Sequence, residues 1–68
     1  MVFEIGKTYR HNDGEEMQIV GQVDTTMYGN CLAAESNRSL DLKPVGKDES
    51  ATANWVEIPK EEWMKNFS

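Results

Sequence analysis

The sequence predicts a small, mainly β domain, in which about five antiparallel strands form a curled sheet or small barrel with one short C-terminal helix. Three observations support this fold class. Residues 16–35 contain two apolar-patterned segments separated by a polar corner at residues 24–26, which is typical of a long β-hairpin. An Asn-Asp-Gly turn precedes this hairpin. The chain ends in a segment that begins with proline and carries acidic and aromatic side chains, as a short helix would.

The chain has 68 residues, so we expect one domain, 1–68, with a core only just large enough to stabilise it. A single cysteine, Cys31, excludes an internal disulfide, and there is no set of Cys and His for structural zinc. We therefore expect no cofactor and no metal. No stretch approaches the roughly 20 apolar residues of a membrane span, and the N-terminus does not resemble a signal peptide. These features indicate a cytoplasmic protein without a membrane contact.

A first short strand is expected at residues 8–11, which are rich in β-branched and aromatic side chains. Residues 12–14 form a turn, since Asn and Asp bond to their own backbone and Gly tolerates positive φ. In the first arm of the hairpin, the odd positions of residues 17–23 alternate with mostly polar ones, as in a half-buried strand. Val20 and Gly21 interrupt this alternation and predict a bulge that bends the strand.

The second arm, residues 27–35, is apolar on both faces, which is typical of a strand covered twice. After a polar turn, an alternating strand is expected at residues 40–43, and Pro44 indicates a strand end or an edge strand. Residues 46–54 are small and charged without periodicity, so we expect a mobile loop with no apolar surface to bury.

A last strand is expected at residues 54–58, followed by a helix at about 59–67 that Pro59 begins. Trp63 and Phe67 are four residues apart, so they share one helix face and should hold the helix against the sheet.

Twelve acidic and seven basic side chains give a net charge of −5. Residues 1–35 contain six acids and two bases, so this part alone carries −4. Such a chain repels phosphate backbones, and direct nucleic-acid binding is therefore not expected.

Catalysis would need a reactive group positioned by a second group, and the candidates are His11 and Cys31. Cys31 lies between apolar neighbours in a predicted strand, where burial as a small hydrophobe is the ordinary outcome. His11 lies beside a turn, where a surface hydrogen bond is the ordinary outcome. The acidic residues 13–16 lack the spacing of a calcium loop. We assign no catalytic residue and expect no enzyme; a thiol enzyme that uses both side chains is the alternative.

The remaining candidate sites are surface features that suit a protein partner. We expect Trp55 and Trp63 to be buried, because a short domain needs its largest rings in the core, and Tyr9 and Tyr28 to be exposed. The predicted partner surface combines these two tyrosines with the acids of the turn and of the loop: Tyr9, Asp13, Glu15, Glu16, Tyr28, Asp48 and Glu49.

Short strands, a tight turn and a long bent hairpin resemble an SH3-like small barrel, a scaffold that serves many unrelated binding tasks. The opening motif of signalling SH3 domains is absent, so polyproline recognition is not implied. A second resemblance is to short uncharacterised bacterial proteins that open with Gly-x-Tyr-Arg-His-x-x-Gly. This resemblance covers about a third of the chain and implies no function. It rests on Gly6, Tyr9, Arg10, His11 and Gly14, followed by Ile19, Gly21 and Val23. Thr8 is one residue more than the motif has between its first Gly and the Tyr. The compact acidic chain is also similar to orphan small proteins of phages and prophages.

Three functions follow as hypotheses. The first is a non-catalytic protein-interaction module with a protein partner. The second is an acidic inhibitor that mimics nucleic acid, because the negative charge is concentrated in one half of the chain. The third is a structural protein that forms homo-oligomers through exposed edge strands.

Overall fold

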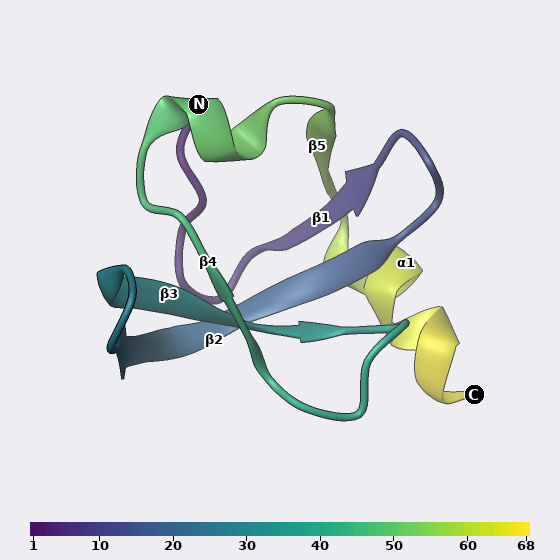
Figure 1. Ribbon diagram of the computed structural model, residues 1–68. Coiled ribbons are helices and arrows are strands. Elements are labelled where there is room, and N and C mark those ends of the chain that lie inside the picture. The colour runs from purple at the N-terminus through teal and green to yellow at the C-terminus, as the bar shows by residue number, and fades with distance from the viewer.

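The computed structural model describes all 68 residues and contains five strands in a single antiparallel sheet. The order in the sheet is β4-β3-β2-β1-β5, so β2 is the central strand and β4 and β5 are the edges (Figure 1). The predicted mainly β fold with five strands and one short C-terminal helix is confirmed. The strands are β1 (Thr8–His11), β2 (Glu16–Thr25), β3 (Gly29–Ser36), β4 (Lys43–Val45) and β5 (Trp55–Ile58).

The long hairpin is formed by β2 and β3, and its register shifts between Ile19 and Gly21. Val20 is the extra residue of this bulge, as the interrupted alternation predicted, and a bulge increases the bend and twist of its strand. The predicted corner at residues 24–26 is displaced, because β2 continues through Thr25. The Thr25 hydroxyl closes the turn: it accepts a hydrogen bond from the backbone N–H of Tyr28 (2.9 Å) and donates one to the carbonyl of residue 29 (3.0 Å).

Strand β3 is buried on both faces, as predicted, since the consecutive residues 31–34 are all buried. The strand predicted at residues 40–43 is wrong, because β4 starts only at Lys43 and the preceding residues form a loop. A local turn replaces that strand: the Ser39 hydroxyl accepts from the N–H of Asp41 and donates to its carbonyl. Pro44 lies in an edge strand, as predicted, where a missing N–H is tolerated.

The segment predicted as a loop at residues 46–54 contains a short 3-10 helix, η1 (Glu49–Thr52). Ala51 packs against the core and Thr52 is buried, so the expectation that this segment has no surface to bury is wrong. The Thr52 hydroxyl donates to the backbone carbonyl of Met1 (3.0 Å), which holds the N-terminal segment beside η1 (Figure 1).

The main core lies between the sheet and the N-terminal segment with η1. It consists of Phe3, Tyr9, Met17, Ile19, Leu32 and Ala34, with Val45, Ala51 and Trp55 at its edge. Tyr9 is only 1% exposed, so the prediction that it is a surface anchor is wrong. Its ring packs edge-on against Phe3 with ring centroids 4.8 Å apart. The core of this short domain therefore includes Tyr9, whereas Trp55, which was expected to be buried, is only half-buried at the edge of the core.

The other face of β1 and β2 is covered by the C-terminal helices, α1 (Lys60–Met64) and η2 (Lys65–Phe67). The predicted helix at about 59–67 is therefore present, in two short pieces after Pro59. Trp63 is 1% exposed, as expected, whereas Phe67 is 59% exposed and does not hold the helix down. No helix of the structure is long and apolar enough to cross a membrane.

Candidate functional site

The acidic turn before β2 is neutralised by cations of the same chain. Oδ2 of Asp13 pairs with Nη1 of Arg38 at 3.2 Å, and Oδ1 of Asp13 lies 3.0 Å from the ring nitrogen Nδ1 of His11. The hydrogen bond from the backbone N–H of Glu15 is the main reason why the pKa of Asp13 lies below its ordinary value, and these two neighbours add to the effect. The Asp13 carboxylate is thus already bound within the chain.

Glu15 is the most strongly held of these carboxylates. Its Oε2 accepts a hydrogen bond from Lys43 Nζ (2.7 Å) and another from Ser36 Oγ (2.6 Å), and the side chain is only 16% exposed. Burial raises the pKa of Glu15, but these hydrogen bonds and the charge of Lys43 outweigh it, so the pKa lies below its ordinary value. Glu15 therefore connects the turn before β2 to β3 and β4.

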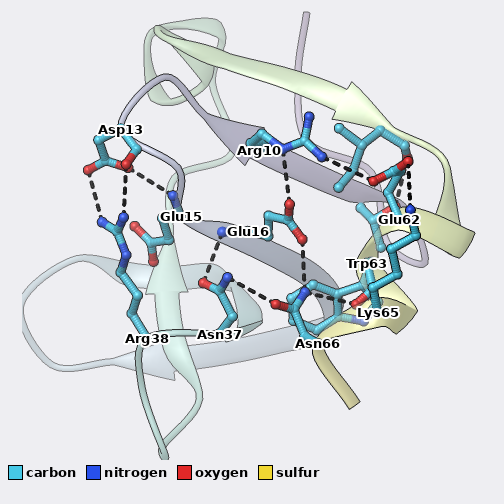
Figure 2. A network of polar contacts seen from close by, with 12 residues as sticks. Arg10, Asp13, Glu15, Glu16, Asn37, Arg38, Glu62, Trp63, Lys65 and Asn66 are labelled. Atoms are coloured by element: carbon cyan, nitrogen blue, oxygen red, sulfur yellow. Dashed lines mark hydrogen bonds and ion pairs between the residues drawn. The ribbon is translucent and has the colours of Figure 1, made fainter. Parts of the chain in front are cut away.

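Glu16 connects the sheet to the C-terminal helices. It accepts hydrogen bonds from Asn66 Nδ2 (2.8 Å) and Arg10 Nε (2.9 Å), and these two contacts, the one from Asn66 first, keep its pKa below the ordinary value. Arg10 also lies 3.5 Å from Glu62 of α1. Figure 2 shows this network between the strands and the C-terminal helices.

The other predicted surface residues are divided between separate places. Glu49 pairs with the N-terminal amine of Met1 at 2.7 Å, and this hydrogen bond lowers its pKa. Tyr28 is 73% exposed in the β2–β3 turn, at the opposite end of β2 from the acidic turn. Tyr28 and Asp48 line a shallow depression of about 550 Å³ beside β4. The structure brings only these two of the seven predicted residues together around a cavity.

His11 and Cys31, the two candidates for catalysis, have different neighbours. The His11 ring packs edge-on against Trp55, with centroids 4.9 Å apart, and its Nδ1 accepts from the N–H of Asp13. Cys31 is buried, and its Sγ lies 3.8 Å from the carbonyl of Gly29. The two side chains therefore do not form a dyad. No group of three His, Cys, Asp or Glu side chains is arranged to hold a metal ion.

The strongest candidate site is a cleft that the sequence did not indicate. It has a volume of about 580 Å³ and lies between the β3–β4 loop and the C-terminal helices. We call it the C-terminal cleft. Its lining residues are Glu35, Ser36, Asn37, Ser39, Leu40, Asp41, Leu42, Trp63, Asn66 and Phe67.

Large apolar side chains stand exposed on both walls of the C-terminal cleft. Leu40 is fully exposed on the loop, at 106% of the reference area, and Leu42 is 60% exposed. On the opposite wall, the ring of Phe67 packs edge-on against the buried Trp63, with centroids 5.3 Å apart, and leaves most of its own surface free. Three of the twelve large exposed apolar side chains thus gather around one cleft, and an exposed apolar patch in a hollow is a candidate interaction site.

A polar bridge fixes the two walls relative to each other (Figure 2). Asn37 on the loop donates from Nδ2 to Oδ1 of Asn66 (3.2 Å), and Asn66 donates from Nδ2 to Glu16 Oε1 (2.8 Å). The side-chain oxygen of Asn37 in turn accepts from the backbone N–H of Glu16 (3.0 Å). The cleft is thus built on residues whose side chains are held by hydrogen bonds, which favours a preformed site.

The charge of the C-terminal cleft is negative and uncompensated. Glu35 and Asp41 line it, and neither takes part in an ion pair. No Lys or Arg is among the lining residues. Leu42 also lines a second, apolar depression of about 180 Å³ with Val23, Ala33 and Pro44, so the apolar surface continues from the cleft across β3 and β4.

The sequence patterns at this place predict other structures. The alternation of Leu40 and Leu42 with polar residues predicts a strand, and the four-residue spacing of Trp63 and Phe67 predicts that Phe67 contacts the sheet. A pair of leucines beside a polar turn, next to a proline-containing edge strand, is the signal from which an exposed apolar loop could have been predicted.

Comparisons with models of protein families, with curated proteins and with solved structures found no match to this chain.

Proposed function

We propose that this protein is a non-catalytic protein-interaction module and that its partner binds in the C-terminal cleft. The observation that carries the proposal is the exposure of Leu40, Leu42 and Phe67 around a single cleft. Full burial of one such side chain contributes about 1.5–3 kcal/mol, so these three side chains are the anchors of the proposed contact. The proposed surface therefore differs from the acidic turn, whose carboxylates are bound within the chain.

We also infer that the curled sheet is an SH3-like small barrel. The inference is supported by the order β4-β3-β2-β1-β5, by the bulge that bends β2 and by the short β5 that closes against β1. This scaffold hosts many binding tasks, so the ligand is argued from the cleft and not from the fold.

The two other hypotheses have no specific observation in their favour. Mimicry of nucleic acid needs free carboxylates, but seven of the twelve acids are in ion pairs. Homo-oligomers built on edge strands need long, open edges, but β4 contains Pro44 and has three residues. The four residues of β5 lie between Asn54, which has a φ of 68°, and Pro59. Short edges interrupted in this way limit strand pairing.

The test is affinity capture from the native host with three forms of the protein. The cleft variant carries L40S, L42S and F67S, and the matched control carries I5S, V56S and M64S, which also replace exposed apolar side chains. Circular dichroism and thermal melting establish that each form is folded. We expect a specific protein to be retained by the wild type and the control but lost with the cleft variant, and isothermal titration calorimetry with that purified protein then measures the contact.

Capture that yields the same proteins with the cleft variant as with the wild type would refute the proposed site.

The genomic neighbourhood tests the separate hypothesis of phage or prophage origin, which predicts neighbouring genes for phage structure, replication or host takeover.

A further inference from the structure

We propose that the occupant of the C-terminal cleft is a basic, partly apolar segment of another protein, in which Lys or Arg side chains flank apolar ones. This inference rests on the proposed function and specifies the chemistry of the partner. The negative charge of the cleft lining is the main support for this inference. The exposed side chains of Leu40, Leu42 and Phe67 define where the segment lies.

The carboxylates of Glu35 and Asp41 make no ion pair and no side-chain hydrogen bond within the chain. Both line the same cleft, which contains no cation. Five of the seven cations of the chain are bound to other acids: Lys7, Arg10, Arg38, Lys43 and Lys65. The formal charge of the lining is therefore −2, and neither of its two carboxylates has an ion-pair partner.

The contrast with the acidic turn strengthens the argument. There, Asp13 and Glu15 pair with cations 25 and 28 residues away in the chain, and Glu16 pairs with Arg10 of the neighbouring strand. Of the five acids without an ion pair, Asp24, Asp48 and Glu61 do not line the C-terminal cleft, whereas Glu35 and Asp41 line it together. Free carboxylates beside exposed apolar side chains are complementary to a cationic partner, which they attract and orient.

A second copy of this chain does not suit the cleft. Each copy carries a net charge of −5, so two copies repel each other on balance, and the carboxylates of Glu35 and Asp41 add to this repulsion at the cleft. Like charges brought together in this way oppose association. The same repulsion argues against an acidic or phosphate-bearing ligand. A basic protein segment satisfies both the charge and the apolar surface.

The apolar surface defines the shape of the segment. Leu42 belongs to both the C-terminal cleft and the depression lined by Val23 and Pro44, so one peptide can contact Phe67 and continue across β3 and β4. Such a peptide places apolar side chains on Leu40, Leu42 and Phe67, and a Lys or Arg beside each free carboxylate.

The experiment selects peptides from a random display library on the purified, full-length protein. We expect the enriched peptides to combine at least one Lys or Arg with two or more apolar residues. Fluorescence anisotropy with a synthetic peptide of the consensus then compares the wild type with E35Q/D41N and with L40S/L42S/F67S. Because exposed ion pairs contribute up to about 1 kcal/mol, we expect E35Q/D41N to bind up to about fivefold more weakly per carboxylate removed.

The control for charge is D48N/E61Q, which removes two exposed carboxylates that lie outside the cleft and have no ion-pair partner. It should bind like the wild type. High salt should weaken binding to the wild type more than binding to E35Q/D41N, since it screens the exposed carboxylates.

The outcomes separate the two proposals. The selected peptides could depend on Leu40, Leu42 and Phe67 but carry no excess of basic residues, and bind E35Q/D41N as well as the wild type. This result would overturn the inference of a basic partner and leave the proposed function intact. Selection that yields no peptide dependent on these apolar side chains would overturn both.

Discussion

Replacement of Glu15 by glutamine tests whether the acidic turn is a structural element. Glu15 Oε2 accepts hydrogen bonds from Lys43 and Ser36 at 2.7 and 2.6 Å, and the side chain is 16% exposed. These contacts join the turn before β2 to residues 21 and 28 positions later in the chain. Glutamine keeps the size and one acceptor oxygen but removes the charge.

The expected loss follows from these two contacts. A hydrogen bond to a charged group contributes about 1.5–3 kcal/mol, and roughly twice as much as a neutral one, so the removal of charge from two such bonds costs about 2 kcal/mol. For a domain of this size, 1 kcal/mol corresponds to about 4–8 °C in melting temperature. We therefore expect E15Q to melt about 10 °C below the wild type near pH 7.

The difference depends on pH in a defined direction. Because the folded-state pKa of Glu15 lies below its ordinary value of 4.5, the carboxylate stabilises the fold fully at pH values well above 4.5. This contribution is lost as the pH falls through the lowered folded-state pKa. Wild type and E15Q should thus converge in stability in acid, where the wild-type side chain is protonated.

Urea denaturation followed by tryptophan fluorescence, at a series of pH values, measures this effect. The matched control is E61Q, which removes an exposed carboxylate without an ion pair and should change the free energy of unfolding by no more than about 0.5 kcal/mol. An E15Q protein as stable as E61Q near neutral pH, or a deficit that persists unchanged in acid, would refute the structural role of Glu15.

Three further predictions concern other parts of the fold. N66A removes the hydrogen bonds from Asn66 to Glu16 and to the carbonyl of Trp63, both 2.8 Å. It should lower the free energy of unfolding, measured by urea titration, by about 1–2 kcal/mol. A change near zero would show that the polar bridge is dispensable. G14A places a side chain at a φ of +102° in the turn before β2, so it should cost about 1–2 kcal/mol, measured as a lower melting temperature. Cys31 is 7% exposed and should react with a thiol reagent only after unfolding; rapid labelling of the folded protein would contradict its burial.

The elements that sequence reasoning predicted well are those that depend on near neighbours. The Asn-Asp-Gly turn, the bulge at Val20 and the start of the C-terminal helix after Pro59 each follow from the backbone preferences of a few adjacent residues. The strand predicted at residues 40–43 is wrong, because a second local preference competes with the alternating pattern there. Its alternating pattern was right for a strand, but the hydrogen bonds of Ser39 make a turn there instead.

The candidate site could not be predicted in this way. The expected surface assumed that acids in a turn are free, but Glu15 and Glu16 are bound by side chains 28 and 50 residues away. It also assumed that the tryptophans fill the core and leave the tyrosines exposed, but Tyr9 lies in the core. Tyr28, Asp13, Asp48 and Glu49 are exposed as the sequence suggested, but Asp13 and Glu49 are paired within the chain.

The sequence by itself determined the class of the fold, the turn at residues 12–14 and the bend in the central strand, because alternation and turn chemistry are local properties. Tertiary structure decided which acids are neutralised, which rings are buried and where a cleft opens. These depend on contacts between the β3–β4 loop and the C-terminal helices, whose side chains, such as Asn37 and Asn66, are 29 residues apart in the chain. Local pattern carries no information about such pairs, and the cleft between them exists only once the chain has folded.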